Sequence, residues 1–138
     1  GIVSLGSLVP MLRAQVLILE EQYKEALALL EANAEAFLHQ GLERLACAVN
    51  ADIAWCRLRC GDSGGARQSA RLATSRLLPT THADDRALTH ARIARIWHEL
   101  GESGLADSHE TSAAAAWQLH MLQQAQLVPT LEEVLEGL

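Results

Sequence analysis

Two cysteines four residues apart, Cys56 and Cys60, have the spacing closest to that of a chemical site. Residues four apart share one face of a helix, so both thiolates could bind a soft metal ion, with His98 as a third ligand. Both cysteines also suit a helix core, because the residues 40 positions further on are Ile96 and Leu100. We therefore interpret them as small core residues and predict no metal site.

No other motif points to catalysis. Ser63 lies between glycines in Gly61-Asp-Ser-Gly-Gly, but a nucleophile elbow needs a preceding strand, and the flanking segments are helical in pattern. The sequence has no phosphate-binding glycine loop. The histidines show no spacing typical of a metal site; they are His39, His82, His90, His98, His109 and His120. The chain is therefore predicted not to be an enzyme and to bind no cofactor.

The composition is that of one helical domain. Of 138 residues 49% are apolar and 4% aromatic, and alanine and leucine dominate. The net charge of −6 argues against nucleic acid or an anionic membrane surface as the main partner. Residues 42–81 alone carry six arginines and three acids, a net charge of +3. This basic segment is either a set of solvated helix faces or a stripe that binds anions.

Cysteine number and apolar run length predict the compartment. An odd number of cysteines without disulfide-like spacing indicates a reducing compartment, so a cytoplasmic location is predicted. No apolar run approaches the roughly 18 residues of a membrane span. The sequence begins at Gly1 without a methionine or a basic leader region, which predicts a fragment of a larger protein.

A repeat of 40 residues organises the chain. Gly61 and Gly101 are separated by this interval, as are Ile53 and Ile93. Two sets of alanines recur with the same interval: Ala14, Ala54 and Ala94, and Ala26, Ala66 and Ala106. Small residues at one place in a helix pair let two backbones approach closely. The repeat therefore predicts three helical hairpins, at about 7–40, 41–80 and 81–125.

Helix ends within a unit are marked by particular residues. Apolar residues three and four apart, from Leu42 to Cys60, predict the first helix of the second unit. Gly61 is predicted to end it in the left-handed conformation, and Asp62 or the following serine to cap the next helix. Pro79 is predicted to end that second helix.

The two ends of the chain carry further prolines. Pro10 either begins the first helix or bends a longer one. After Pro129, Thr130 and Glu133 match a capping box, which predicts a separate short helix at 130–137. Trp117, in an alanine run, is predicted to lie in the core. The prediction is seven helices and no strand.

The chain resembles the tetratricopeptide repeat (TPR) family. The resemblance rests on Tyr23-Lys-Glu-Ala-Leu-Ala-Leu-Leu, on the paired glycines of the turns and on the mid-helix alanines, and it covers about residues 8–125. The interval of 40 departs from the family's usual length of about 34 residues. Among the equivalent positions Leu17, Arg57 and Trp97, only Trp97 has the expected aromatic side chain. The resemblance implies an all-α, TPR-like superhelix of three hairpins plus a short terminal helix.

The resemblance also implies a binding surface. The first helices of stacked hairpins line a concave side, and there a partner peptide would contact Gln15, Trp55, Arg59, Arg95, His98 and Glu99. Trp55 is the predicted floor, since an aromatic residue on a charged edge is typical of a contact hot spot, or else it packs between repeats. Arg59, Arg92 and Arg95 either hold a carboxylate or phosphate, or pair with neighbours, as Arg95 could with Glu99.

The function implied is that of a protein- or peptide-binding module. Long units of this kind are similar to the helical domains of bacterial signalling and transcription-regulatory proteins, including the ATP-dependent LuxR-type activators. Two alternatives remain at this stage: a domain that senses a small-molecule effector, and a module for self-association or structural spacing. No direct nucleic-acid or membrane partner is predicted.

Overall fold

The computed structural model contains six helices and no strand among the residues it describes, which confirms the all-α class. The backbone is described for residues 5–39 and 43–138, and side chains for 9–36 and 46–138. The helices are α1 (Leu5–Leu19), α2 (Tyr23–His39), α3 (Glu43–Arg59), α4 (Ser63–Arg76), α5 (Ala83–Glu99) and α6 (Ser103–Glu136). Leu42 and the predicted boundary at 40/41 lie outside the described residues.

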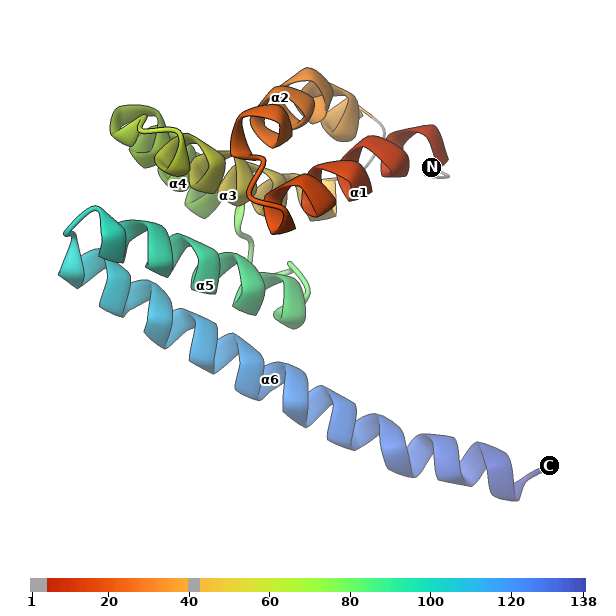
Figure 1. Ribbon diagram of the computed structural model, residues 1–138. Helices are drawn as coiled ribbons and strands as arrows, with labels where there is room; N and C mark the ends of the chain where they lie inside the picture. The colour runs from red at the N-terminus through yellow and green to blue at the C-terminus, as the bar shows by residue number, and fades with distance from the viewer. Residues whose placement is uncertain (1–4, 40–42) are drawn as a thin grey trace.

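The helices form three successive antiparallel pairs (Figure 1). The pairs are α1 with α2, α3 with α4, and α5 with α6. Between pairs, α3 packs on α2 and α5, and α4 packs on α5. The central helix α3 therefore lies between the first and third pairs, and the odd-numbered helices share one side of the molecule.

The three turns within pairs have the same hydrogen bonds. Gly61 and Gly101 adopt φ of 86° and 79°, as predicted for helix-ending glycines. In the second turn the Asp62 amide donates to the Arg57 carbonyl at 2.8 Å; in the first and third turns the equivalent bonds are Gln22 to Leu17 and Glu102 to Trp97. Asp62 also caps α4, because its carboxylate accepts from the Gly65 amide at 2.9 Å.

The first turn places a glutamate where the other two have glycine. Glu21 has φ of 60°, the left-handed region that costs a residue with a Cβ about 1 kcal/mol or more. Glu21→Gly is therefore expected to raise the free energy of unfolding by about 1 kcal/mol, measured by urea denaturation. The matched control is Glu20→Gly at the preceding position, where no strain is relieved and stability should not rise.

Alanines at the repeat positions make the close helix contacts. Ala14, Ala54 and Ala94 are at most 2% exposed, as are Ala26, Ala66 and Ala106. The largest fully buried side chain is Trp97. Ile53 and Ile93, at equivalent positions, are also buried. The spacing of apolar residues thus identified the buried face of these helices.

The last helix differs from the prediction. Residues 130–137 do not form a separate helix, because α6 continues through Pro129 to Glu136. The Thr130 hydroxyl donates to the Gln126 carbonyl at 3.5 Å instead of capping a new helix. A helix can continue through a proline where water or a side chain binds the carbonyls left free, and this part of α6 is exposed. Trp117 is 49% exposed, so its predicted place in the core is wrong.

The bounds of α1 and α4 decide the predictions made for Pro10 and Pro79. Pro10 lies inside α1, which begins at Leu5, so Pro10 does not begin the helix. The helix α4 ends at Arg76, before the predicted stop at Pro79, and Leu77 is extended with ψ of 119°. Pro79 disfavours helical backbone in Leu78, the residue before it, but the chain has already left the helix at Leu77.

Candidate functional site

A groove of about 350 Å³ lies between α1, α3 and α5. Its apolar walls include Leu12, 61% exposed, and Leu88, 68% exposed. Its polar groups are Gln15, Asp52 and Arg92. The other lining residues are Met11, Ala48, Val49, Ala51 and Thr89. An apolar trough with a few convergent polar groups is the usual form of a binding site in a protein.

Asp52 is the charged group at the base of this groove. Its side chain is 13% exposed, and it accepts a hydrogen bond from Gln15 Nε2 at 2.7 Å. Arg92 Nη2 lies 3.5 Å from the other carboxylate oxygen. Burial raises the pKa of Asp52, although the Gln15 hydrogen bond and the Arg92 charge both act to lower it. The carboxylate is therefore incompletely compensated, and a cation in the groove would stabilise its charged form.

Three guanidinium groups surround the ring of Trp55, next to the groove. The Cζ atoms of Arg95, Arg59 and Arg92 lie 4.6, 5.0 and 5.4 Å from the ring centroid. Such placement is attractive because the ring face is electronegative. Glu99 lies 3.3 Å from Arg59 and 3.9 Å from Arg95, and so offsets part of the positive charge. We call Trp55, Arg59, Arg92, Arg95 and Glu99 the arginine cluster.

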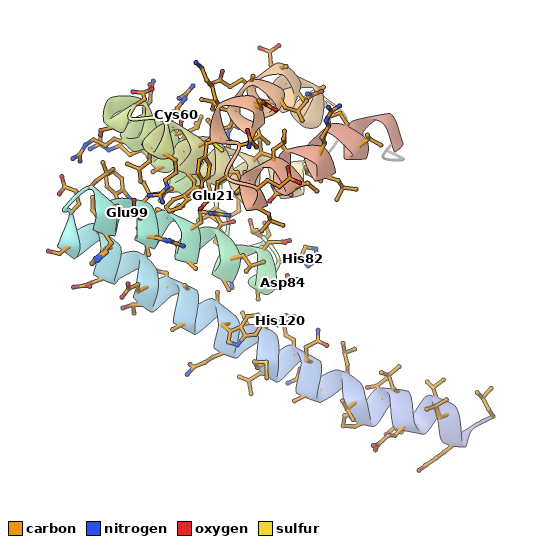
Figure 2. The ribbon with its side chains drawn as sticks, viewed as in Figure 1. Glu21, Cys60, His82, Asp84, Glu99 and His120 are labelled. Atoms are coloured by element: carbon orange, nitrogen blue, oxygen red, sulfur yellow. The ribbon has the colours of Figure 1, made fainter. Side chains whose placement is uncertain are left out.

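The structure brings most of the predicted binding residues together. Trp55, Arg59, Arg95 and Glu99 meet in the arginine cluster, and Gln15 lies in the adjoining groove. His98 does not join them; it lines a separate shallow hollow between α5 and α6, together with Arg95 and Glu110. Figure 2 shows Glu99 at the end of α5, close to the turn into α6.

Trp55 is not the accessible floor that the sequence suggested. It is 3% exposed and belongs to the core, packed between hairpins and covered by the arginines. The alternative of a tryptophan packed between repeats is the one observed. The polar base of the groove is Asp52, one helical turn away on α3.

Equivalent positions of the 40-residue repeat contact one another here. Asp52 pairs with Arg92, Trp55 with Arg95, and Arg59 with Glu99, each 40 residues apart. The sequence indicated Arg92 as a residue that could bind an anion, but it indicated no role for Asp52. The sequence did contain a usable signal: Asp52 and Arg92 occupy the same position of successive units and carry opposite charges, which favours an ion pair between the units.

Cys56 and Cys60, the two cysteines with the spacing of a chemical site, differ in burial. Cys56 is fully buried, as predicted, whereas Cys60 is exposed at the end of α3 (Figure 2), so its predicted core position is wrong. Burial, followed by the nearby Asp52 and Cys60, raises the pKa of Cys56 to about 12. Cys56 is therefore a thiol at neutral pH. No group of three potential metal ligands occurs among the described residues.

A histidine pair between α5 and α6 was missed from the sequence. The Nδ1 atoms of His90 and His109 lie 2.9 Å apart, so one neutral ring donates to the other. Burial lowers the pKa of both rings; for His90, the charges of His109 and Arg86 lower it further. Their separation of 19 residues crosses the turn between helices, which the spacing rules for one helix face do not cover.

Stability is expected to fall as the pH drops below about 6.5, the ordinary pKa of histidine. Just below this pH, both histidines bind protons in the unfolded chain but not in the folded chain, where their pKa values are lowered. Proton binding therefore stabilises the unfolded state relative to the folded state. Melting temperatures measured from pH 7 to 5 should therefore fall more steeply for the native chain than for His90→Gln. The exposed His98→Gln serves as control, and an unchanged slope in His90→Gln would contradict the assignment.

Comparison with known proteins gives no match, whether to a protein-family model, a curated protein or a solved structure. Within the part of the chain that the structure describes, no helix has the length and apolar character required to cross a membrane.

Proposed function

We propose that the chain is a protein-interaction module that binds an extended or helical peptide in the groove between α1, α3 and α5. The partner segment carries a lysine or arginine beside apolar side chains. The observation that carries this proposal is Asp52, a carboxylate with raised pKa at the base of an apolar groove. The resemblance to TPR proteins adds support, since their concave side binds peptides.

The groove offers both apolar surface and a carboxylate, which match the apolar and cationic side chains of such a segment. The exposed leucines at positions 12 and 88 offer apolar surface on opposite walls, from α1 and α5. A cationic side chain reaching Asp52 would form a charge-assisted hydrogen bond in a largely desolvated place. Arg92 already lies on one side of this carboxylate at 3.5 Å, longer than the usual length of such a bond.

By the same resemblance, the setting that we propose is a cytoplasmic signalling or transcription-regulatory protein. The groove volume also falls in the range of small-molecule sites, so an effector with a cationic group beside an apolar body is the second candidate. A rise in melting temperature with small amines, and none with peptides, would favour that candidate.

Selection from a phage-displayed library of random peptides tests the peptide proposal. The expected result is enrichment of sequences that combine leucine-like residues with lysine or arginine. Leu88→Ser should weaken the selected peptides about tenfold or more, because burial of one leucine contributes about 1.5–3 kcal/mol. The matched control is Leu72→Ser on α4, 41% exposed and outside the groove. Equal binding by Leu88→Ser would overturn the groove as the site.

A further inference from the structure

The second half of α6 extends beyond the rest of the fold. In Figure 2, His82 and Asp84 mark the start of α5, and His120 marks the point where α6 passes it. Residues 120–136 continue as one helix, about 25 Å long at 1.5 Å per residue (Figure 1). Of the other described helices, only α5 makes extensive contacts with α6. We call residues 120–136 the α6 extension.

The α6 extension continues the face that binds α5. In the first half of α6, the buried side chains are Ala106, His109 and Ala116. At 100° per residue, these three lie in one arc of about 140° with seven of the large apolar residues that follow, whereas Leu119 and Leu122 lie outside it. The seven within the arc, the α6 stripe, are Trp117, Met121, Leu127, Val128, Leu131, Val134 and Leu135, each 49–68% exposed.

The change in residue size along this face indicates a different neighbour. Small alanines contact α5, whereas the α6 stripe consists of leucine, valine, methionine and tryptophan. Seven large apolar side chains in one line exceed the scattered exposed apolar residues that monomers normally carry. A helix with an apolar stripe at this spacing is suited to pack against another helix.

Charges on the α6 extension favour one arrangement of that second helix. The extension contains Glu132, Glu133 and Glu136 but no lysine or arginine. A parallel copy would bring each glutamate level with itself, and like charges repel. An antiparallel copy centred on Val128 would bring the three glutamates level with Gln124, Gln123 and His120.

We propose that the α6 stripe binds a second copy of this chain, with the two α6 extensions antiparallel about a two-fold axis near Val128. The same arrangement sets Met121 of each copy level with Leu135 of the other and the two Val128 side chains level with each other, so that apolar side chains meet at the centre and near both ends of the extension. The polar Gln124 lies on the same face between Met121 and Val128. Such an interface is self-complementary, as a two-fold dimer requires. It is separate from the groove, so either proposal can fail without the other.

Sedimentation equilibrium tests the dimer. The native chain is expected to change from 15.0 kDa to twice that mass with increasing concentration. Leu131→Asp places a charge in the α6 stripe and should leave a monomer. The matched control is Leu122→Asp, 62% exposed on the opposite face of α6, which should still dimerise. Circular dichroism of each variant checks that the helices are retained.

Disulfide trapping tests the orientation. In a Cys60→Ser background, Val128→Cys should form an intermolecular disulfide, because the two copies of position 128 meet near the axis. Leu135→Cys should not, because in the antiparallel pair the two positions lie about 20 Å apart. A monomer at all concentrations would overturn the proposal and leave the stripe for a different chain, and efficient trapping through position 135 would overturn the antiparallel arrangement.

Discussion

Trp55→Ala is expected to lower the free energy of unfolding by about 3–5 kcal/mol, the usual cost of removing a large aromatic side chain from a core. The ring is 3% exposed and belongs to the main apolar cluster, to which all six helices contribute side chains. Its removal leaves a cavity and also deprives three guanidinium groups of their aromatic face. Denaturation in urea, followed by circular dichroism, measures the change.

The matched control is Arg95→Gln in the same cluster. The Arg95 side chain is 64% exposed, so loss of its contacts with the ring and with Glu99 should cost less than about 1 kcal/mol. A Trp55→Ala variant as stable as Arg95→Gln would show that the ring is not part of the core. Because of this difference, Trp55→Ala is unsuitable as a binding variant, since its loss of folding would be confused with a loss of binding.

Asp52→Asn is expected to act in opposite directions on stability and on binding. Burial raises the pKa of Asp52 above its unfolded value, so the charged carboxylate destabilises the folded state relative to the protonated one. Below the unfolded pKa both states are protonated and the penalty is absent. As the pH rises through the raised folded pKa the penalty becomes complete, and at neutral pH the asparagine variant should melt at a higher temperature.

Binding of a lysine-containing peptide should fall about 10- to 100-fold in the same variant. A hydrogen bond to a charged group contributes about 1.5–3 kcal/mol, and asparagine removes the charge. Isothermal titration of a peptide from the phage selection, against the native chain and Asp52→Asn, measures the loss. Asp62→Asn, at the α4 cap, changes the same charge outside the groove and should leave the affinity unchanged. Equal affinity for Asp52→Asn would remove Asp52 from the site.

Local sequence rules predicted much of this fold. The glycines at 61 and 101 and the alanines at 40-residue intervals act through backbone conformation and close contact, which depend on residue type. Apolar spacing correctly predicted that Val49, Ile53 and Cys56 of α3 are buried, but it missed the burial of Trp55 and wrongly included Cys60. Of the six predicted binding residues only Gln15 lines the groove. Trp55, Arg59, Arg95 and Glu99 meet beside it, because equivalent positions of a repeat lie on the same side of successive helices.

Other features depend on where helices sit relative to one another. The distance between His90 and His109 depends on the registration of α5 against α6, and a spacing rule for one helix cannot supply it. The burial of Trp55 depends on the two neighbouring hairpins. The uninterrupted course of α6 through Pro129 was missed because the capping-box signal at Thr130 favoured a local break.

The groove links helices that otherwise have few contacts. Extensive packing joins α1 to α2 and α3 to α5, whereas α1 and α5 meet chiefly across the groove, from which both supply lining residues. In a chain of nearest-neighbour contacts, a terminal hairpin can open without the others. A peptide that touches both walls would therefore couple the first hairpin to the third. With the peptide bound, the amide protons of the first hairpin, α1 and α2, should exchange with solvent only when the whole domain unfolds. Unfolding of the domain would then become more cooperative.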